Sequence, residues 1–474
     1  MIFRLALRSL LAHPVRTLVL ACGFGLGVSV MATLLGVGEV ILDQARSPAL
    51  AGGGDVVLFS ETGTITAARW IVSSALRTGL FKQRIAVASP AGRATLFLVR
   101  NGEPMAIRAR GGIPSLERAL GDSETTQVAA WIDTPLDISW SSPEPGAALR
   151  ALDRFHRIPD VPLRADSWAE WLYFNGRIGD TRFYLTFLVG PKRASGTRAA
   201  GVRLQLDRAG QLSSYSESHD VDEAALLAEA PDLTIGSSRV RLEGLRYHVM
   251  LDLPLEYIDS RGRREVSSAA RARGSLFLEG VAGRALPPLT IHGANGWLSG
   301  YVVPVMSGAL TGRLDVGGQT IVFDGGAGYH DHNWGFWKDV SWQWGQVQHG
   351  GLSFVYGRVH PPADAADPDR IPGFLAALGP DGLVGFSMNV SIEETDDGGK
   401  DRPRSVTVRG RGAGLDLTMD LAVQNAAVTR TAGGLFGGGL DFLQLRGDYH
   451  VRGRAGTQSI DFTAAGVAET FRSR

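Results

Sequence analysis

The sequence predicts a mainly β protein, with barrels or sandwiches of short antiparallel strands behind one apolar N-terminal helix. Three observations lead to this prediction. Apolar and polar residues alternate strictly over much of the chain beyond about residue 165. Glycine accounts for 61 of the 474 residues, as expected for many tight turns between strands. A long stretch near the N-terminus, Thr17 to Gly38, carries no charge.

The uncharged stretch is long enough to cross a membrane as a helix. At about 1.5 Å per residue it spans the roughly 30 Å hydrocarbon core of a bilayer. The charged residues before it, Arg4, Arg8 and Arg16, are all basic, so the positive-inside rule predicts that residues 1–16 stay in the cytoplasm. We therefore expect a transmembrane helix over residues 17–42 and an inner-membrane, single-pass protein whose C-terminal domains lie in the periplasm.

Two other interpretations of this stretch stay open. A cleaved secretory signal has an apolar region of about 7 to 15 residues, and the region here is longer. A lipoprotein signal would use Cys22, the single cysteine, but Arg16 leaves few uncharged residues before it. The simplest interpretation is that Cys22 is a small apolar residue of the helix, and one cysteine cannot form an intrachain disulfide.

The composition argues against two classes of protein. The 48 basic and 48 acidic residues balance, so the chain lacks the broad positive field of a nucleic-acid binder, and no nucleic-acid partner is expected. Hydrophobic residues make up 44% and charged residues 20% of the chain, which predicts a folded core rather than a disordered protein.

Residues 43–160 form an extension of uncertain fold behind the span. The patterning is compatible with a strand over Asp55 to Phe59, a helix over Ala67 to Leu80, a strand over Ala94 to Arg100 and a short helix over Gly146 to Phe155. Prolines at the end of this extension mark the boundary with the next unit, near residue 160.

Two β units are expected beyond this boundary, over residues 161–285 and 286–474, with the Pro287-Pro288 pair as the seam between them. Across both units only Asp222 to Ala230 has a helical pattern. The alternating segments of the two units are Phe183 to Phe187, Val202 to Leu206, Val240 to Leu242, Tyr247 to Leu251, Gly351 to Val359, Leu383 to Ile392, Arg404 to Gly410, Leu415 to Val423 and Ile460 to Thr470.

A first cluster of candidate functional residues lies between Trp168 and Gly176. In a strand, Trp171, Tyr173 and Asn175 share one face, which combines aromatic bulk with polar tips. These residues are candidates for ligand binding. The alternative is an aromatic strand that only packs the floor of a barrel.

A second cluster lies in a tryptophan-rich region. With a period of two, Tyr329, Asp331 and Asn333 share one face of a strand, opposite two histidines and a tryptophan. A polar triplet among indole rings suits a mostly apolar pocket that holds a few hydrogen-bonding groups. The further ligand-binding candidates of this region are Trp297, Tyr301, Trp334, Trp342 and Trp344.

Asp331 is the candidate general acid. A carboxyl group taken out of water in an aromatic pocket has a raised pKa, so it can hold a proton near neutral pH and give it to an electron-rich carbon. Tyr329 and Asn333 would orient the carboxyl or position a water molecule. The alternative is that Asp331 and Asn333 satisfy backbone groups in a turn.

Other chemistries have less support. His330 and His332 could supply two metal ligands from one strand face, but no third ligand is evident nearby, so no metal is expected. A Ser-His-Asp hydrolase would be signalled by a Gly-x-Ser-x-Gly sequence, which does not occur. No cofactor is expected either.

The two clusters resemble strands of the AttH and carotenoid 1,2-hydratase (hydroxyneurosporene synthase) family. The sequence Glu170-Trp171-Leu172-Tyr173-Phe174-Asn175-Gly176 is similar to the family's Glu-Trp-Trp-Tyr-Phe-x-Gly strand, and Gly328 to Gly335 is similar to its Gly-Tyr-x-Asp-x-Asn-x-Gly strand. This resemblance covers about residues 165 to 474. It implies two lipocalin-like antiparallel β-barrels in tandem.

The resemblance also implies roles for single residues. Tyr329 and Asp331 match the catalytic tyrosine and the proton-donating aspartate that add water across an isoprenoid double bond without a cofactor. The hydratases also place a histidine and a tryptophan two residues apart on the preceding strand, where Tyr301 and Val303 stand in this chain. This departure favours an AttH-like ligand-binding member over a carotenoid hydratase.

The N-terminal region resembles a different family. Leu5 to Leu10, followed by His13-Pro14-Val15-Arg16-Thr17 and the glycine-spaced span, is similar to the N-terminus of permeases of the macrolide-exporter or cell-division type of ABC transporter. The resemblance covers about 60 residues. Such permeases have several spans, so this chain is not expected to transport by itself.

Together these observations predict a membrane-anchored periplasmic lipocalin-like protein that binds a long apolar ligand, such as an isoprenoid, an acyl chain or a polyketide. The expected partners are this ligand, the inner membrane, and the permease and ATPase subunits of an ABC-type export system. The alternative is a cofactor-free hydratase or isomerase, a hydro-lyase with Asp331 as its general acid. A third class is a structural accessory of a permease, which would need no polar pocket.

Overall fold

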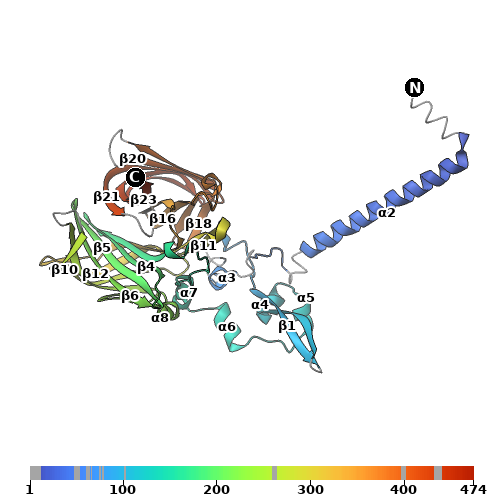
Figure 1. Cartoon of the computed structure of the whole chain (residues 1–474), viewed down its shortest axis with the longest axis horizontal. Coiled ribbons are helices and arrows are strands. Elements are labelled where there is room, and N and C mark those ends of the chain that lie inside the picture. The colour runs from blue at the N-terminus through green and yellow to red at the C-terminus, as the bar shows by residue number, and fades with distance from the viewer. Residues whose placement is uncertain are drawn as a thin grey trace. The chain divides into compact units, whose positions relative to one another are not determined.

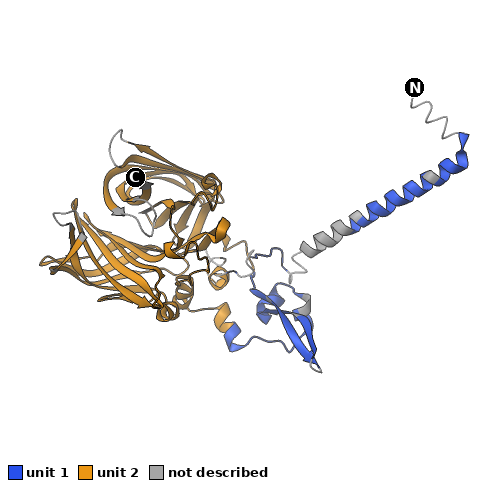
Figure 2. Ribbon diagram, in the orientation of Figure 1, with its two compact units in different colours: residues 1–65, 87–137 blue, residues 66–86, 138–474 orange. Residues whose placement is uncertain are grey.

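The chain is mainly β, with one long apolar helix near its N-terminus (Figure 1), which confirms the fold class predicted from the sequence. It divides into two compact units, residues 1–65 with 87–137 and residues 66–86 with 138–474 (Figure 2). The computed structural model describes residues 12–46, 54–59, 65, 67–73, 76, 79–100, 103–258, 264–396, 402–431 and 440–473.

The first unit contains the apolar helix α2 (Pro14–Arg46). Its segment Pro14–Leu34 has a mean hydropathy of 2.0 and is long and apolar enough to cross a membrane. The unit also holds an antiparallel hairpin of β1 (Ala91–Arg100) and β2 (Glu103–Gly112), which includes the predicted strand near residue 94. Its short helices are α4 (Pro114–Ala119) and α5 (Ser123–Gln127).

The second unit begins with short helical segments that the sequence predicts only in part. The expected helix over Ala67 to Leu80 is α3 (Ala68–Ser73) followed by a 3-10 turn, η3 (Gly79–Phe81). The expected helix near residue 146 is α7 (Pro145–Leu152), and α6 (Pro135–Ser141) precedes it where the two units meet in the chain. The segment Asp55 to Phe59, expected as a strand, has no regular structure over its described residues.

A closed antiparallel barrel fills the first part of the second unit. In the described part of the chain, eight strands follow one another around it, and the last, β14, pairs with the first, β3. The pairing of β9 with β10 completes the ring, and β7, β8, β11 and β13 lie beside it. The bounds of its elements are β3 (Trp168–Ile178), β4 (Thr181–Lys192), β5 (Thr197–Arg208), β6 (Gln211–Asp222), α8 (Glu223–Glu229), β7 (Leu233–Ile235), β8 (Ser238–Glu243), β9 (Arg246–Ile258), β10 (Arg264–Glu279), β11 (Leu286–His292), η5 (Ala294–Gly296), β12 (Leu298–Val316), β13 (Gln319–Val322) and β14 (Gly326–Phe336).

The second sheet begins after β14 and curls without closing along its hydrogen-bonded edges. One backbone bridge, Phe386 to Ala413, brings β18 near the turn between β20 and β21. The bounds of its elements are β15 (Ser341–His349), β16 (Leu352–His360), η6 (Pro368–Arg370), β17 (Phe374–Gly379), β18 (Gly382–Ser387), β19 (Val390–Asp396), β20 (Pro403–Gly412), β21 (Leu415–Thr431), β22 (Leu440–Ala455) and β23 (Gln458–Ser473).

The change from the first sheet to the second lies between Phe336 and Ser341, not at residues 285 and 286. The Pro287-Pro288 pair lies inside β11, where the register of β11 against β12 shifts between Leu286 and Leu289. Proline cannot donate to a strand ladder and is tolerated at such irregularities of short strands. The two prolines therefore mark a bulge in the first sheet and not the seam between the sheets.

Each sheet encloses its own apolar core. Inside the first barrel Leu185, Phe187 and Leu204 are fully buried, so side chains fill its interior. Inside the second sheet Met419 and Tyr449 are fully buried in a separate cluster. This filling follows from the period of two, which points every second side chain of each strand inward.

The outer face of the first barrel packs against one face of the second sheet. Arg203 on β5 donates to Thr429 on β21, and Arg446 on β22 forms an ion pair with Asp207 on β5. The aromatic rings of Trp171 and other residues of both sheets lie within this interface. This interface therefore brings together strands that are far apart in the sequence, such as β5 and β22.

Candidate functional site

Strand β14 presents two different sets of side chains on its two faces. His330 and His332 point toward the interior of the first barrel, where His330 stacks on Phe174 with ring centroids 4.1 Å apart. Tyr329 and Asp331 point outward, toward the second sheet. This division follows the alternation that the sequence predicts.

The neighbouring strand β3 adds three of the predicted residues to the outer set. Cα register pairs Asp331 with Tyr173, and the adjacent pairs are Tyr329 with Asn175 and Asn333 with Trp171. Tyr173 and Tyr329 are almost completely buried. The two predicted clusters, well separated in the sequence, are thus one surface of the first barrel.

The second sheet covers this surface with hydrogen-bonding side chains. Trp344 Nε1 donates to the Tyr329 hydroxyl at 2.9 Å. Gln346 Nε2 donates to Asn175 Oδ1 at 3.0 Å, and Gln444 Nε2 donates to the Tyr173 hydroxyl at 3.4 Å. We call the set formed by Tyr173, Asn175, Tyr329, Asp331, Asn333, Trp344, Gln346, Gln444 and Glu469 the inter-sheet site.

The carboxyl group of Asp331 lies at the centre of the inter-sheet site. Burial raises its pKa well above the usual value, and the nearby carboxyl of Glu469 raises it further. Hydrogen bonds from Tyr329 and Asn333 act in the opposite direction, and Asn333 Nδ2 donates to Asp331 Oδ1 at 2.6 Å. A carboxyl group with a raised pKa keeps its proton to a higher pH than an ordinary one, as a proton donor must.

Glu469 supplies a second carboxyl group from β23. It pairs with Trp344 on one side and with Gln444 on the other, so all three side chains lie on the face toward the first barrel. Burial raises the pKa of Glu469 to about 7, although hydrogen bonds from Tyr173 and other neighbours act to lower it. The inter-sheet site therefore holds two carboxyl groups whose pKa values are raised.

Several buried polar atoms of this site have no hydrogen-bond partner among the described residues. They are Asn175 Nδ2, Gln346 Oε1, Gln444 Oε1 and Glu469 Oε1. A buried polar group without a partner costs about 1–3 kcal/mol, so such groups usually bind water or a ligand. A cavity of about 40 Å³, lined in part by Asn175 and Gln346, opens beside them.

Aromatic side chains from both sheets surround the polar groups. Trp171 stacks with Trp342 at 5.6 Å between ring centroids, and Trp342 packs on Phe471 at 3.6 Å. Tyr301 contacts the ring of Trp344 edge-on at 5.1 Å and stacks on Phe374. These rings give the inter-sheet site an apolar wall.

Two of the predicted ligand-binding residues lie elsewhere. Trp297 is fully buried, and its Nε1 donates to the backbone oxygen of Phe336 at 3.0 Å, which is a structural bond. Trp334 points toward the barrel interior with the histidines, stacked on His156 at 4.0 Å. An added Cβ at Gly300, on the neighbouring strand, would collide with the Trp334 indole, so glycine is required beneath this ring.

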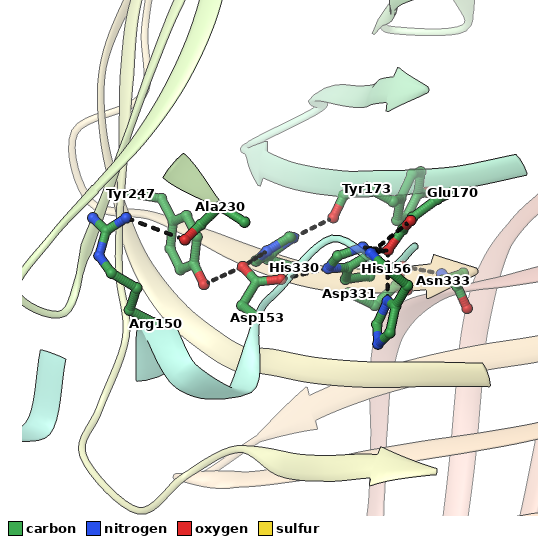
Figure 3. A network of polar contacts seen from close by, with 11 residues as sticks. Arg150, Asp153, His156, Glu170, Tyr173, Ala230, Tyr247, His330, Asp331 and Asn333 are labelled. Atoms are coloured by element: carbon green, nitrogen blue, oxygen red, sulfur yellow. Dashed lines mark hydrogen bonds and ion pairs between the residues drawn. The ribbon is translucent and has the colours of Figure 1, made fainter. Parts of the chain in front are cut away.

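A buried network holds the inner face of β14 (Figure 3). Asp153, directly after α7, accepts from His330 Nε2 at 3.0 Å and from His332 Nδ1 at 2.7 Å. The Tyr247 hydroxyl donates to the same carboxylate at 2.6 Å. These contacts, with burial acting against them, hold the pKa of Asp153 well below its usual value.

The network continues through Glu170 on β3. His332 Nε2 lies 3.0 Å from Glu170 Oε1, and His156 Nδ1 lies 2.7 Å from the same oxygen. Despite burial, its two histidine partners lower the pKa of Glu170 to about 2, and the two carboxylates raise the pKa of His332 to about 9. Arg198 adds a further cation, with its Nη2 3.9 Å from Glu170 Oε2.

The network also brings together three residues that could ligate a metal ion, although His332 is the one member of the predicted histidine pair among them. Donor atoms of His156, Glu170 and His332 lie within 4.8 Å of one another, close enough to surround a metal ion. However, both histidines already hydrogen-bond to Glu170, and the raised pKa of His332 favours its protonated form, which cannot bind a metal ion. These residues form a network of ion pairs and hydrogen bonds that holds β14 in place.

Sequence reasoning missed the residues of the second sheet that complete the inter-sheet site. Gln346 continues the alternation of Trp342 and Trp344 on one face of β15, so the period of two could have identified it. Glu469 and Gln444 gave no such signal, because their strands resemble ordinary alternating strands. Their place opposite Asp331 follows only from the packing of the two sheets.

Comparison with known proteins gives similarity at the level of structure. No family model matches the sequence, and no curated protein matches it. The solved structures that are similar include an AttH-like protein from Nitrosomonas europaea, with a TM-score of 0.40 and 14% identity over 67% of this chain and 97% of that one.

CghA is a second similar structure, with a TM-score of 0.42 and 13% identity over 68% of this chain and 94% of that one. CghA with Sch210972 gives a TM-score of 0.42 and 12% identity over 70% and 96%. At these values the similarity says nothing about shared chemistry.

Proposed function

We propose that this chain is a membrane-anchored protein that binds a long apolar molecule between its two β-sheets. The observation that supports this most is the inter-sheet site itself. Buried polar atoms without partners, next to Asp331 and Tyr329, lie among indole and phenyl rings contributed by both sheets. A mostly apolar site with a few placed polar groups is typical of small-molecule binding.

The interior of the first barrel is a poorer location for the ligand. Its core side chains are fully buried, and the residues after α7 reach into it through Asp153 and Phe155. Between the sheets the cavity of about 40 Å³ is too small for a whole apolar molecule. Binding therefore requires the facing side chains to move apart, which is easier at a polar, incompletely hydrogen-bonded interface than in an apolar core.

Mass spectrometry of the full chain purified in detergent tests this function. We expect an isoprenoid, acyl or polyketide molecule to be retained and to decrease in a Tyr301→Ala variant, because Tyr301 stacks in the aromatic wall. Tyr257→Ala is the matched control, since Tyr257 is 46% exposed on the same barrel. Equal retention in Tyr301→Ala and wild type would contradict binding between the sheets.

The second candidate function is a cofactor-free hydratase or isomerase. It is favoured by one observation, the raised pKa of Asp331 beside the Tyr329 hydroxyl. A protonated carboxyl in an aromatic site can protonate a double bond, and Glu469, with a pKa of about 7, can accept a proton from water or from carbon. Both candidate functions use the inter-sheet site, and only an enzyme would convert the bound molecule.

The membrane location and the export partners belong to the same proposal. The apolar part of α2 supports an inner-membrane anchor, with the two sheets in the periplasm. The resemblance of the first 60 or so residues to ABC permeases supports an association with permease and ATPase subunits. In that setting the chain would receive or deliver the apolar cargo of an exporter.

A further inference from the structure

Two arginines lie side by side at one end of the inter-sheet site. Arg177 on β3 and Arg182 on β4 are direct cross-strand partners, and both are half-buried. Like charges that face each other in this way repel. Neither guanidinium forms a hydrogen bond or an ion pair with any residue that the structure describes.

The acidic groups nearby are bound by other partners. Asp207, the direct cross-strand partner of Arg182, forms an ion pair with Arg446. Burial, followed by the charge of Arg182, lowers the pKa of Arg177, and the attraction of Asp448 opposes this. Asp448 itself accepts a hydrogen bond from Gln424. An anion between the two guanidinium groups would offset the repulsion and accept hydrogen bonds from both of them.

The space beside the arginines has the right lining for such an anion. Arg177, Arg182 and Gln348 line the cavity of about 40 Å³ together with Asn175 and Gln346. Gln346 is 5% exposed and donates through Nε2 to Asn175 Oδ1. Asn175 Nδ2 has no partner among the described residues, so this buried amide nitrogen can donate to an anion. The volume holds a group of a few atoms, and the planar arginine fork fits a carboxylate in two-point contact.

The cavity lies at one end of a row of side chains on β3 that leads to the centre of the inter-sheet site. Tyr173, Asn175 and Arg177 follow one another on the same face of β3, and Tyr173 is paired with Asp331. At about 3.3 Å per residue, Arg177 lies about 13 Å from Tyr173 along the strand. A molecule that begins at the arginines and follows β3 therefore passes over Asp331.

We infer that the apolar ligand is a long-chain carboxylic acid whose carboxylate is held by Arg177 and Arg182. Its carbon chain runs along β3 toward Asp331 and the aromatic wall. This inference rests on the proposed function and narrows it, because a hydrocarbon isoprenoid offers no group for the two arginines.

The test uses the full chain in detergent with two probes, a polyene fatty acid and its methyl ester. Energy transfer from tryptophan to the polyene reports binding, after subtraction of empty micelles. We expect Arg177→Gln and Arg182→Gln each to weaken binding of the acid by about 10- to 100-fold, as for loss of a hydrogen bond to a charged group. Binding of the ester stays unchanged, and Arg313→Gln, an exposed arginine of β12, serves as the control.

Three results would overturn the inference. If acid and ester bind wild type equally and the arginine variants bind both like wild type, the ligand is not an acid, while binding between the sheets stands. If acetate or phosphate raises the thermal stability as much as the long acid, in an arginine-dependent way, the site takes small anions only. If neither probe binds, the long-chain acid is wrong, and the molecule retained on purification decides the proposed function separately.

Discussion

Asp331 differs from the other buried carboxyl groups of the first barrel in what it contacts. Asp153 and Glu170 each accept from His332, and their pKa values are lowered. Asp331 is the neighbour of His332 on β14 and points to the opposite face of that strand, next to Tyr329 and the carboxyl group of Glu469. Its pKa is raised. Buried carboxyl groups whose surroundings shift their pKa values in opposite directions are typical of active sites, where one group stays ionised and another donates a proton.

The substitution Asp331→Asn keeps the shape of the side chain and removes its transferable proton. If the chain is an enzyme, turnover should fall by about 100-fold or more, while ligand affinity changes little, because general acid catalysis is lost and the packing is kept. Steady-state kinetics together with ligand retention measures both effects. Asp180→Asn, at an exposed turn, is the control.

If the chain is a carrier, Asp331→Asn and a second variant, Trp171→Ala, should differ in their effect on ligand retention. Ligand retention and any export phenotype would then match wild type in Asp331→Asn, whereas Trp171→Ala should release ligand because it removes buried aromatic surface. An Asp331→Asn protein that converts substrate at the original rate excludes the general acid. Unchanged retention in Trp171→Ala excludes the aromatic wall.

The sequence identifies the residues that the first barrel contributes to the inter-sheet site, and few of those that the second sheet contributes. Alternation alone puts Tyr329 and Asp331 on one face, because strand geometry is local. Trp297 and Trp334, also predicted to bind ligand, lie outside the inter-sheet site, since the composition of a region does not reveal which side of a barrel a ring faces. Glu469 could not be predicted, because its contact depends on how two sheets pack.

Strand β14 is the element on which both clusters depend. The inner network fixes His330 and His332, and the same backbone carries Tyr329 and Asp331 outward. An element held by buried ion pairs on one side can keep polar side chains in place on the other side, even if the interface opens for a ligand as we propose. The inner network is thus a positioning device for the site.

This network predicts a pH dependence of the folded state. The pKa of His332 is raised to about 9 from an ordinary value of 6.5, so its stabilisation is complete below about pH 6.5 and is lost as the pH rises through about 9. Glu170, with a pKa lowered to about 2, contributes above about pH 4.5 and loses this contribution as the pH falls toward 2.

Urea unfolding of the barrel region between pH 5 and 10 measures this dependence. The free energy of unfolding should decrease from pH 6.5 to 9, and His332→Gln should be less stable at pH 6 and largely lack the decrease. His292→Gln, at an exposed histidine of β11, should behave like wild type. The same decrease in His332→Gln would rule out the network as its cause.

The segment around α7 forms part of the first barrel, although the sequence indicates a boundary near residue 160. Glu144 caps α7 by accepting from the backbone of Gly146 and Ala147, and Asp153 and His156 follow directly. Truncation therefore has a sharp expected effect. A chain that begins at Val161 should unfold at a lower temperature than one that begins at Pro143, because it leaves His332 and Tyr247 without their carboxylate.

Thermal unfolding followed by circular dichroism compares the two truncated chains. Both should give strongly β spectra, since all strands of both sheets are kept. Equal unfolding temperatures would mean that the segment only covers the barrel and does not stabilise it. A strongly helical spectrum of either chain would contradict the fold.

For the whole molecule, the sequence predicts the fold class correctly and one seam wrongly. Period-two patterning and glycine-rich turns reveal strands wherever they occur, so the β content and most strand positions agree with the structure. Which strands share a sheet depends on pairing between distant segments, and patterning does not encode it. The proline pair of β11 therefore looked like a boundary although it lies within the first sheet.

The orientation of the chain in a membrane is a prediction at the same scale. A reporter enzyme that is active only in the periplasm, fused after Leu42, should be active, because three arginines precede the apolar segment and no acid does. Reversing the sign of Arg8 and Arg16 to glutamate should reduce this activity. Activity of a cytoplasmic reporter at the same junction would contradict the orientation, and a mature chain without residues 1–42 would indicate cleavage.

The closure of the first barrel also has a kinetic consequence. Its final pairing joins β3 to β14, strands that are roughly 160 residues apart, and this is the same pairing that brings Tyr173 to Asp331. Contacts between such distant segments form late and slowly. During synthesis, half of the inter-sheet site is therefore present long before the other half arrives. If a ligand binds between the sheets, as we propose, its capture can begin only after closure, and retained ligand then marks chains that have completed folding.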